Sequence, residues 1–117
     1  MIIPPGPLKV MVATKPVDFR KGAVGLAALV EHELGLKPFS GVAFIFRSRR
    51  ANRIKLLVWD GTGLVLVSKV LQNGGFHWPR PGDGVMRLSP SQASALFEGL
   101  QWSKMHAPRV TPPTTSR

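Results

Sequence analysis

The stretch that decides the fold is residues 42–71, VAFIFRSRRANRIKLLVWDGTGLVLVSKVL. It holds three short runs rich in β-branched and aromatic residues, which are Val42–Arg47, Arg53–Trp59 and Gly63–Leu71. The polar loop Ser48–Asn52 separates the first two runs, and the turn dipeptide Asp60-Gly61 separates the last two. Runs of this length between turn residues are typical of antiparallel strands, so we expect three consecutive strands that pair as neighbours.

Side chains alternate between the two faces of a strand, and the runs follow this alternation. In the second run Ile54, Leu56 and Val58 share one face of the predicted sheet, and the opposite set is Arg53, Lys55, Leu57 and Trp59. In the first run the two sets are Val42, Phe44 and Phe46, and Ala43, Ile45 and Arg47. The alternation therefore places Arg53 and Lys55 side by side on one face.

A strand and a helix are predicted before this stretch, after an extended proline-rich arm at Met1–Pro7. Leu8–Ala13 has the composition of a strand, and Pro16 makes a turn after it. Asp18 is the expected cap of the helix, because apolar residues then recur at spacings of three and four. These residues are Phe19, Ala23, Leu26, Val30 and Leu34, and Gly35 is expected to end the helix.

A loop, a strand and a second helix are predicted after the stretch. The glycine- and proline-rich segments Asn73–Gly75 and Trp78–Gly84 are expected to form a mobile connection. Val85–Leu88 is long enough for one short strand. Ser89 and Gln92 can then form a capping box at the start of a helix from Pro90 to about Leu100. Its apolar stripe is Ala93, Leu96, Phe97 and Leu100.

The predicted fold class is α+β, with a single small domain over residues 1–103. Its mainly antiparallel β-sheet meander has four to five strands, and two helices pack on it because their apolar stripes need a sheet to bury them. The first helix is expected on one face and the second at an edge of the sheet. Residues 104–117 form a tail rich in proline and threonine that we expect to be disordered.

Composition excludes several classes of protein. The chain has 117 residues and no cysteine, which rules out a disulfide framework, a cysteine-based zinc site and a thiol nucleophile. Its apolar runs are far shorter than the ~20 residues that span a bilayer. We therefore expect a cytoplasmic protein with no membrane partner and no secretion signal.

Positive charge is the strongest compositional signal, because 16 Lys and Arg against 6 Asp and Glu give a net charge of +10. A field of this sign attracts polyanions, so nucleic acid is the expected partner. Five basic residues fall within nine positions with no acidic residue among them, and they define the basic hairpin: Arg47, Arg49, Arg50, Arg53 and Lys55. Such a hairpin can present guanidinium groups to successive phosphates. Arg20, Lys21 and Arg80 are expected to extend this surface, and the alternative is a solvated turn that its charge keeps soluble.

The aromatic segment Phe76–Arg80 allows two interpretations. Its rings and its cation suit contact with unstacked bases or a wedge in a minor groove. A loop that packs its rings onto the core is more common, and we favour packing here. Trp59 and Trp102 are likewise expected to make core or helix-cap contacts rather than to form binding platforms.

The sequence offers little for catalysis. The three histidines lack metal-ligand spacing, and two of the six carboxylates, Asp18 and Asp60, are already expected in a cap and a turn. Gly61-Thr62-Gly63 lies between two strands with no helix after it, so it is not a phosphate loop. We therefore predict that the protein is not an enzyme and has no catalytic residue, no metal site and no cofactor.

A longer pattern resembles a known family, the TnpB accessory protein of insertion-sequence family sixty-six, which is distinct from the RNA-guided nuclease of the same name. The resemblance covers about residues 4–102 in one collinear order. The matching segments are Asp18–Gly22, Gly25–Val30, Pro38–Gly41, Phe44–Arg47, Arg49-Arg50, Asn52–Leu57, Trp59–Gly63, Phe76, Trp78-Pro79, Leu88–Pro90 and Leu96–Leu100.

The resemblance implies a bacterial, cytoplasmic and nucleoid-associated protein that is needed together with a separate transposase for transposition. It carries over no catalytic motif, since cutting and joining belong to the transposase. We expect the protein to bind the DNA of the element through the basic hairpin, mostly at phosphates. The alternatives are a module that docks on the transposase without touching DNA, an RNA-binding protein and, least favoured, a nuclease. The oligomeric state stays open.

Overall fold

Five strands and two helices make up the described part of the chain, which is residues 9–80, 82 and 84–102 of a computed structural model. In chain order they are β1 (Val10–Ala13), α1 (Ala23–His32), β2 (Ala43–Arg47), β3 (Arg53–Trp59), β4 (Leu64–Val70), β5 (Val85–Leu88) and α2 (Pro90–Phe97). Every strand and helix predicted from the sequence is therefore present. The proline-rich arm up to Pro7 and the tail 104–117 lie outside the described residues.

The five strands form one sheet in the order β4-β3-β2-β1-β5. The predicted meander is confirmed, because β2, β3 and β4 pair antiparallel, with Phe44 opposite Leu57 and Leu57 opposite Leu66. On the other side of β2 lies β1, which runs parallel to it, and β5 pairs antiparallel with β1. A parallel pair needs a crossover connection, and α1 forms it. The α+β class with a mainly antiparallel sheet is thus confirmed.

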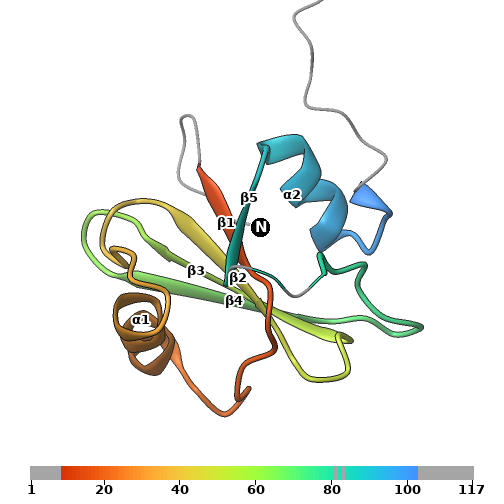
Figure 1. The fold of residues 1–117 in the computed structure, drawn as a ribbon, viewed down its shortest axis with the longest axis horizontal. Helices are drawn as coiled ribbons and strands as arrows, with labels where there is room; N and C mark the ends of the chain where they lie inside the picture. Colours follow the sequence, from red (N-terminus) through yellow and green to blue (C-terminus); the bar gives the residue numbers. More distant parts are fainter. Residues whose placement is uncertain (1–8, 81, 83, 103–117) are drawn as a thin grey trace, which may run out of the picture.

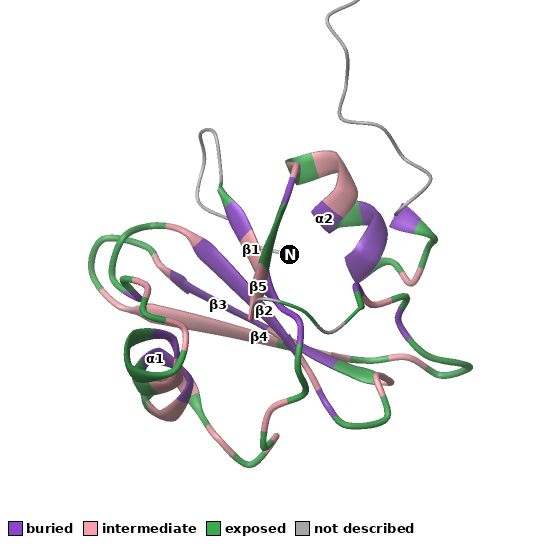
Figure 2. Ribbon diagram, in the orientation of Figure 1, coloured by how far each residue is buried: buried purple, intermediate pink, exposed green. Residues whose placement is uncertain are grey.

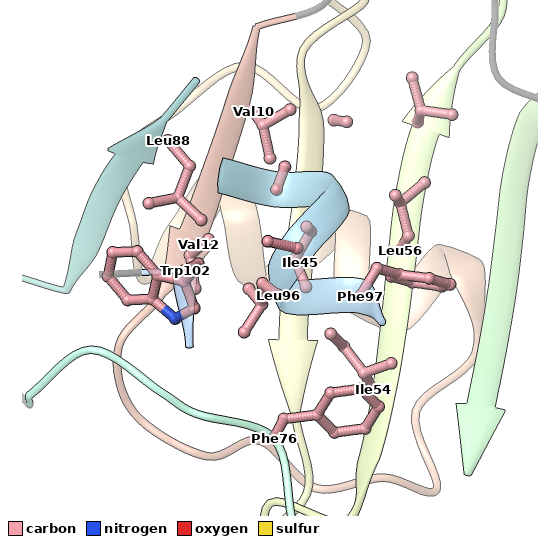
Figure 3. Packing of buried hydrophobic residues seen from close by; sticks show 14 residues of the cluster. Val10, Val12, Ile45, Ile54, Leu56, Phe76, Leu88, Leu96, Phe97 and Trp102 are labelled. Atoms are coloured by element: carbon pink, nitrogen blue, oxygen red, sulfur yellow. The ribbon is translucent and has the colours of Figure 1, made fainter. Parts of the chain in front are cut away.

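The two helices lie on opposite faces of the sheet (Figure 1). Leu26, Ala27 and Val30 of α1 share one buried cluster with Phe44, Phe46 and Leu57. Leu96 and Phe97 of α2 share the other with residues of the central strands, among them Ile45, Ile54 and Leu56 (Figure 3). These are the two alternating sets predicted for β2 and β3. Buried residues consequently concentrate in the central strands and on the inner sides of the helices (Figure 2).

Two helix predictions need correction. Asp18 does not cap α1, which begins at Ala23 after the N-cap Gly22, and no side chain caps that end. The Asp18 carboxylate instead accepts hydrogen bonds from the backbone amide and the guanidinium of Arg20. The second correction concerns α2, which covers a face of the sheet rather than an edge, because its apolar stripe joins the cluster over β1, β2 and β3. Its capping box between Ser89 and Gln92 is confirmed.

The segment that follows β4 is tied to the sheet at several points, and the predicted mobility of 73–75 and 78–84 stays a prediction. The Leu71 amide donates to the Asn52 carbonyl, and the Phe76 amide donates to the Ala51 carbonyl at 2.6 Å. The Trp78 indole then donates to the Ala13 carbonyl. Phe76 is buried in the α2 cluster, so the packing interpretation holds for this ring. Pro81 and Asp83, which belong to the predicted connection, lie outside the described residues.

Candidate nucleic-acid interface

One end of the sheet collects most of the basic residues selected from the sequence. The parallel pairing of β1 and β2 puts their C-terminal ends together, and the Val17 amide donates to the Arg47 carbonyl there. Antiparallel pairing brings the start of β3, the end of β4 and the start of β5 to the same end. We call this the basic end of the sheet. It includes the loop Ser48–Asn52 between β2 and β3, which carries Arg49 and Arg50.

The loop has a defined shape. The Ser48 amide donates to the Arg53 carbonyl, the Ala51 amide donates to the Ser48 carbonyl, and the Ser48 hydroxyl accepts from the Arg53 amide. Ala51 adopts a φ of 57°, in the left-handed region, which lets the chain turn back into β3. Arg49 and Arg50 are exposed at this turn, and no side-chain bond within the described residues engages either guanidinium. Both guanidinium groups are therefore available to a ligand.

Two members of the basic hairpin are engaged by the protein itself. The Arg47 guanidinium donates to the carbonyls of Ser48 and Arg49, so it supports the loop from inside. The Lys55 amine donates to the carbonyls of Phe19 at 2.7 Å and Lys21 at 2.9 Å. It also lies 4.5 Å from the centre of the Phe19 ring, a cation–π contact. Lys55 therefore fastens the segment before α1 onto the sheet.

The remaining basic residues differ in whether their side chains are paired within the protein. Arg53 is exposed at the start of β3, on the same face as Lys55, and is not bonded through its side chain to any described residue. Arg20 is exposed but paired with Asp18 at 2.8 Å. Hydrogen bonds from Arg20 hold the pKa of the Asp18 carboxyl well below its ordinary range, so this acid stays ionised and offsets the nearby positive charge. Lys21 lies half-buried beside Gly25.

Arg80 lies apart from the hairpin, on the segment between β4 and β5, which is bonded to the loop Ser48–Asn52 through Phe76. It is exposed and borders a hollow together with Trp78 and Trp102. Lys15 is a basic residue that the sequence reading missed. It is exposed two residues after the end of β1, and the parallel pairing of β1 with β2 puts it at the basic end. Lys15 could have been found from the sequence only if the parallel pairing of β1 with β2 had been predicted.

The other end of β3 has a contrasting turn, Asp60–Gly63. The Asp60 carboxylate accepts hydrogen bonds from the amides of Thr62 and Gly63, and these lower the pKa of its carboxyl. Among residues 9–80, 82 and 84–102, no three His, Asp or Glu side chains lie close enough together to hold a metal ion. No helix in the same residues is long and apolar enough to cross a membrane.

Fold and surface together define a small basic α+β protein whose sheet concentrates free arginines at one end. The chain belongs to the family of IS66 Orf2-like proteins, whose model matches residues 8–107. This confirms the resemblance found in the sequence. The family indicates an accessory role in transposition rather than a known class of enzyme.

Two relatives come from Sinorhizobium fredii (strain NBRC 101917 / NGR234). The chain is 43% identical over 114 residues to a protein called uncharacterized protein y4jC, with 97% of each chain covered. It is 38% identical over 95 residues to uncharacterized protein y4hO, which covers 81% of this chain and 83% of the relative. No solved structure gives a significant match.

Proposed function

We propose that this protein binds the DNA of its insertion sequence at the basic end of the sheet and thereby assists the separate transposase. The observation that carries the proposal is the set of exposed arginines Arg49, Arg50 and Arg53, whose side chains are bonded to no described residue. Guanidinium groups in this state can each form two charge-assisted hydrogen bonds to a phosphate. The net charge of +10 adds a long-range attraction that speeds encounter with DNA.

The bonded cations serve the interface indirectly. Arg47 and Lys55 fix the loop Ser48–Asn52 and the segment before α1, so the free arginines start from a fixed backbone. A preorganised surface loses less conformational freedom on binding. We therefore assign phosphate contact to Arg49, Arg50 and Arg53, with Arg20, Lys21, Arg80 and Lys15 as weaker contributors. Arg47 and Lys55 become positioning residues.

The test is fluorescence anisotropy of the purified protein with a labelled duplex from the element ends and a scrambled duplex. Titrations run from about 50 mM to about 300 mM salt, because each neutralised phosphate adds about 0.9 to the slope of log affinity against log salt. The variant Arg49→Ala with Arg50→Ala should lower that slope by about 2 on both duplexes. Lys9→Ala with Lys37→Ala, which removes two exposed lysines beyond the other end of the sheet, is the control and should change it little.

Three results would count against the proposal. Wild-type protein that is folded but does not bind either duplex would refute DNA binding. An unchanged slope in the arginine variant would refute the assignment of these residues, and a stronger effect of the lysine control would move the interface to the other end. A tighter complex with the element duplex than with the scrambled one would add recognition of the ends.

Docking on the transposase is a second candidate, and an apolar surface favours it. Beside α1 lies a hollow of about 220 Å³ lined by Val24, Ala28, Phe39 and Leu64 among others. Val24 and Phe39 are 79% and 55% exposed, although both are apolar. Exposed apolar residues that cluster are typical of protein interaction sites. This surface is separate from the loop Ser48–Asn52, so docking and DNA binding are compatible.

A nuclease-treated pull-down of the transposase of the same element tests docking. Val24→Glu should abolish capture, because it places a charge in the apolar hollow, whereas Ser94→Glu on the exposed side of α2 should leave capture intact. Capture by wild-type protein that is lost with Val24→Glu alone supports docking. Equal capture by both variants, or no capture by wild-type protein, refutes it for this surface.

A further inference from the structure

A hollow of about 430 Å³ lies where the segment 77–80, the strand β5 and the end of the described chain meet. Its lining includes His77, Trp78, Arg80, Met86, Gln101 and Trp102. The volume falls within the range of small-molecule sites, which is about 300–1,000 Å³. Met86 pairs with Val12, whose side chain belongs to the α2 cluster, so the hollow opens on the α2 face of the sheet.

Hydrogen bonds hold the aromatic wall of this hollow in place. The Trp78 indole donates to the Ala13 carbonyl at 2.8 Å, and the Trp102 indole donates to the His77 carbonyl at 2.6 Å. Both rings also pack against the buried cluster beneath α2, and Figure 3 shows Trp102 beside Leu96. Their polar atoms are therefore satisfied by the protein. Trp102 is only 6% exposed and Trp78 is half-buried, so Trp78 supplies most of the aromatic surface that a ligand can reach, and Trp102 supports it from behind.

The rim of the hollow is polar, in contrast to its aromatic wall. His77, Arg80 and Gln101 are exposed, and none of their side chains is hydrogen-bonded to a described residue. They supply an imidazole, a guanidinium and an amide, which donate and accept hydrogen bonds. A nucleobase has a flat apolar face and an edge of donors and acceptors, so it matches both the wall and the rim.

The hollow lies one short segment away from the free arginines. The Phe76 amide is bonded to the Ala51 carbonyl in the loop Ser48–Asn52, and Arg80 follows four residues later. Four residues of extended chain span at most about 14 Å. A nucleic-acid strand whose phosphates lie on Arg49 and Arg50 can therefore reach the hollow within a few nucleotides.

We infer that this hollow binds an unpaired base of a DNA strand whose backbone lies on the basic end of the sheet. The inference rests on the proposed DNA binding and narrows its substrate. Paired bases are stacked inside a duplex and cannot enter, so only an overhang, a bulge or a frayed end can fill the hollow. The protein is thus expected to prefer DNA with a short single-stranded segment, as at an opened element end.

The test compares a blunt duplex with the same duplex carrying a three-base overhang, at one salt concentration. Wild-type protein should bind the overhang about tenfold more tightly, because stacking of one base on aromatic residues is worth a factor of that order. A 2-aminopurine in the overhang should lose fluorescence as it stacks on the Trp78 indole. His77→Ala with Gln101→Ala removes two rim side chains and keeps Arg80, and it should reduce the preference to less than about threefold.

Gln72→Ala with Asn73→Ala is the matched control, since it removes two exposed neutral side chains outside the lining and should keep the tenfold preference. Equal affinity of wild-type protein for blunt and overhang duplexes, without quenching, would overturn the inference and leave salt-dependent duplex binding intact. A preference that survives the rim variant would place the unpaired base elsewhere. Failure to bind any DNA would refute the proposed function as well, so the two failures are distinguishable.

Discussion

The two turns at the ends of β3 differ in charge and in how they are anchored to the rest of the protein. The loop Ser48–Asn52 carries two free arginines, and other parts of the chain bind to its backbone, including Phe76 and Leu71. The turn Asp60–Gly63 carries a carboxylate whose bonds within the described residues come from the same turn, from the amides of Thr62 and Gly63 and from the Thr62 hydroxyl. One strand therefore joins a basic turn that is anchored to distant segments and an acidic turn that is self-contained.

The comparison shows that charge alone does not make the candidate interface. Lys55 and Arg47 belong to the same basic hairpin as Arg49 and Arg50, yet their side chains bond to carbonyls of the protein. They hold the basic end together, and this fixes the backbone that carries the exposed arginines. Substitutions at Lys55, Gly75, Asp18 and Asp60 test this division between bonded cations and free arginines, and their expected effects decrease in that order.

The largest effect is expected from Lys55→Ala. The substitution leaves the carbonyls of Phe19 and Lys21 without their donor and removes the cation from the Phe19 ring. Hydrogen bonds to a charged group contribute about 2 kcal/mol, so the free energy of unfolding should fall by about that amount. Urea denaturation measures it. Arg53→Ala, two residues away on the same face, should change stability by less than about 0.5 kcal/mol but weaken DNA binding; equal stability losses would contradict the division.

A smaller effect is expected from Gly75→Ala, which disturbs the anchoring of the basic turn. An added Cβ would lie 3.1 Å from the Ala51 carbonyl oxygen, and Ala51 already holds a left-handed conformation. We expect the free energy of unfolding to fall by about 1 kcal/mol, the lower range for overpacking.

The acidic turn offers the control for this variant. A Cβ at Gly63 would meet no atom within 4 Å, so Gly63→Ala should leave the denaturation midpoint nearly unchanged. If Gly63→Ala destabilises the protein as much as Gly75→Ala, the two turns do not differ in anchoring.

Asp18→Asn should tighten DNA binding by about twofold to threefold at low salt. The change removes the carboxylate that pairs with Arg20 at 2.8 Å, so the Arg20 charge becomes available to a phosphate. Solvent screens an exposed ion pair of this kind, which limits the gain. Anisotropy titration measures it, and the double variant Asp18→Asn with Arg20→Ala should show no gain. A persistent gain in the double variant would exclude Arg20 as its cause.

The smallest effect concerns Asp60 and pH. Hydrogen bonds from Thr62 and Gly63 lower the pKa of the Asp60 carboxyl in the folded state. Its contribution to stability is therefore present above about pH 4, the ordinary range of Asp, and is lost as the pH falls through the lower folded value. The stability difference between wild-type protein and Asp60→Asn should shrink as the pH falls below about 4. A difference that stays constant with pH would show that the carboxylate charge is not what the turn uses.

Much of the fold was predictable because its signals are local. Alternation in β2 and β3 gave the two faces correctly, and the Ser89–Gln92 capping box marked the start of α2. The predicted start of α1 was wrong: the Asp18 carboxylate accepts from the Arg20 amide, as a cap would, but the helix begins only at Ala23 after Gly22. The place of β1 beside β2 was not predicted, since a parallel pairing across a helix leaves no local pattern.

The candidate site was predictable only in part, for the same reason. Sequence alternation placed Arg53 and Lys55 on one face, but the bonds that engage Lys55 come from residues 34 and 36 positions earlier. Such long-range contacts decide which cations stay free. The hollow near Trp78 likewise joins segments that are far apart in the chain, so the sequence suggested its aromatic residues but not Gln101 or Met86.

The most direct test of the account is amide chemical-shift mapping by NMR during titration with a short duplex. We predict that the largest perturbations fall on residues 48–53 and on Arg20 and Lys21, with little change at residues 60–63. This measurement compares both turns of β3 in one unmodified protein. Perturbations concentrated at residues 60–63, or at the apolar surface around Val24 and Phe39, with residues 48–53 unchanged, would contradict it.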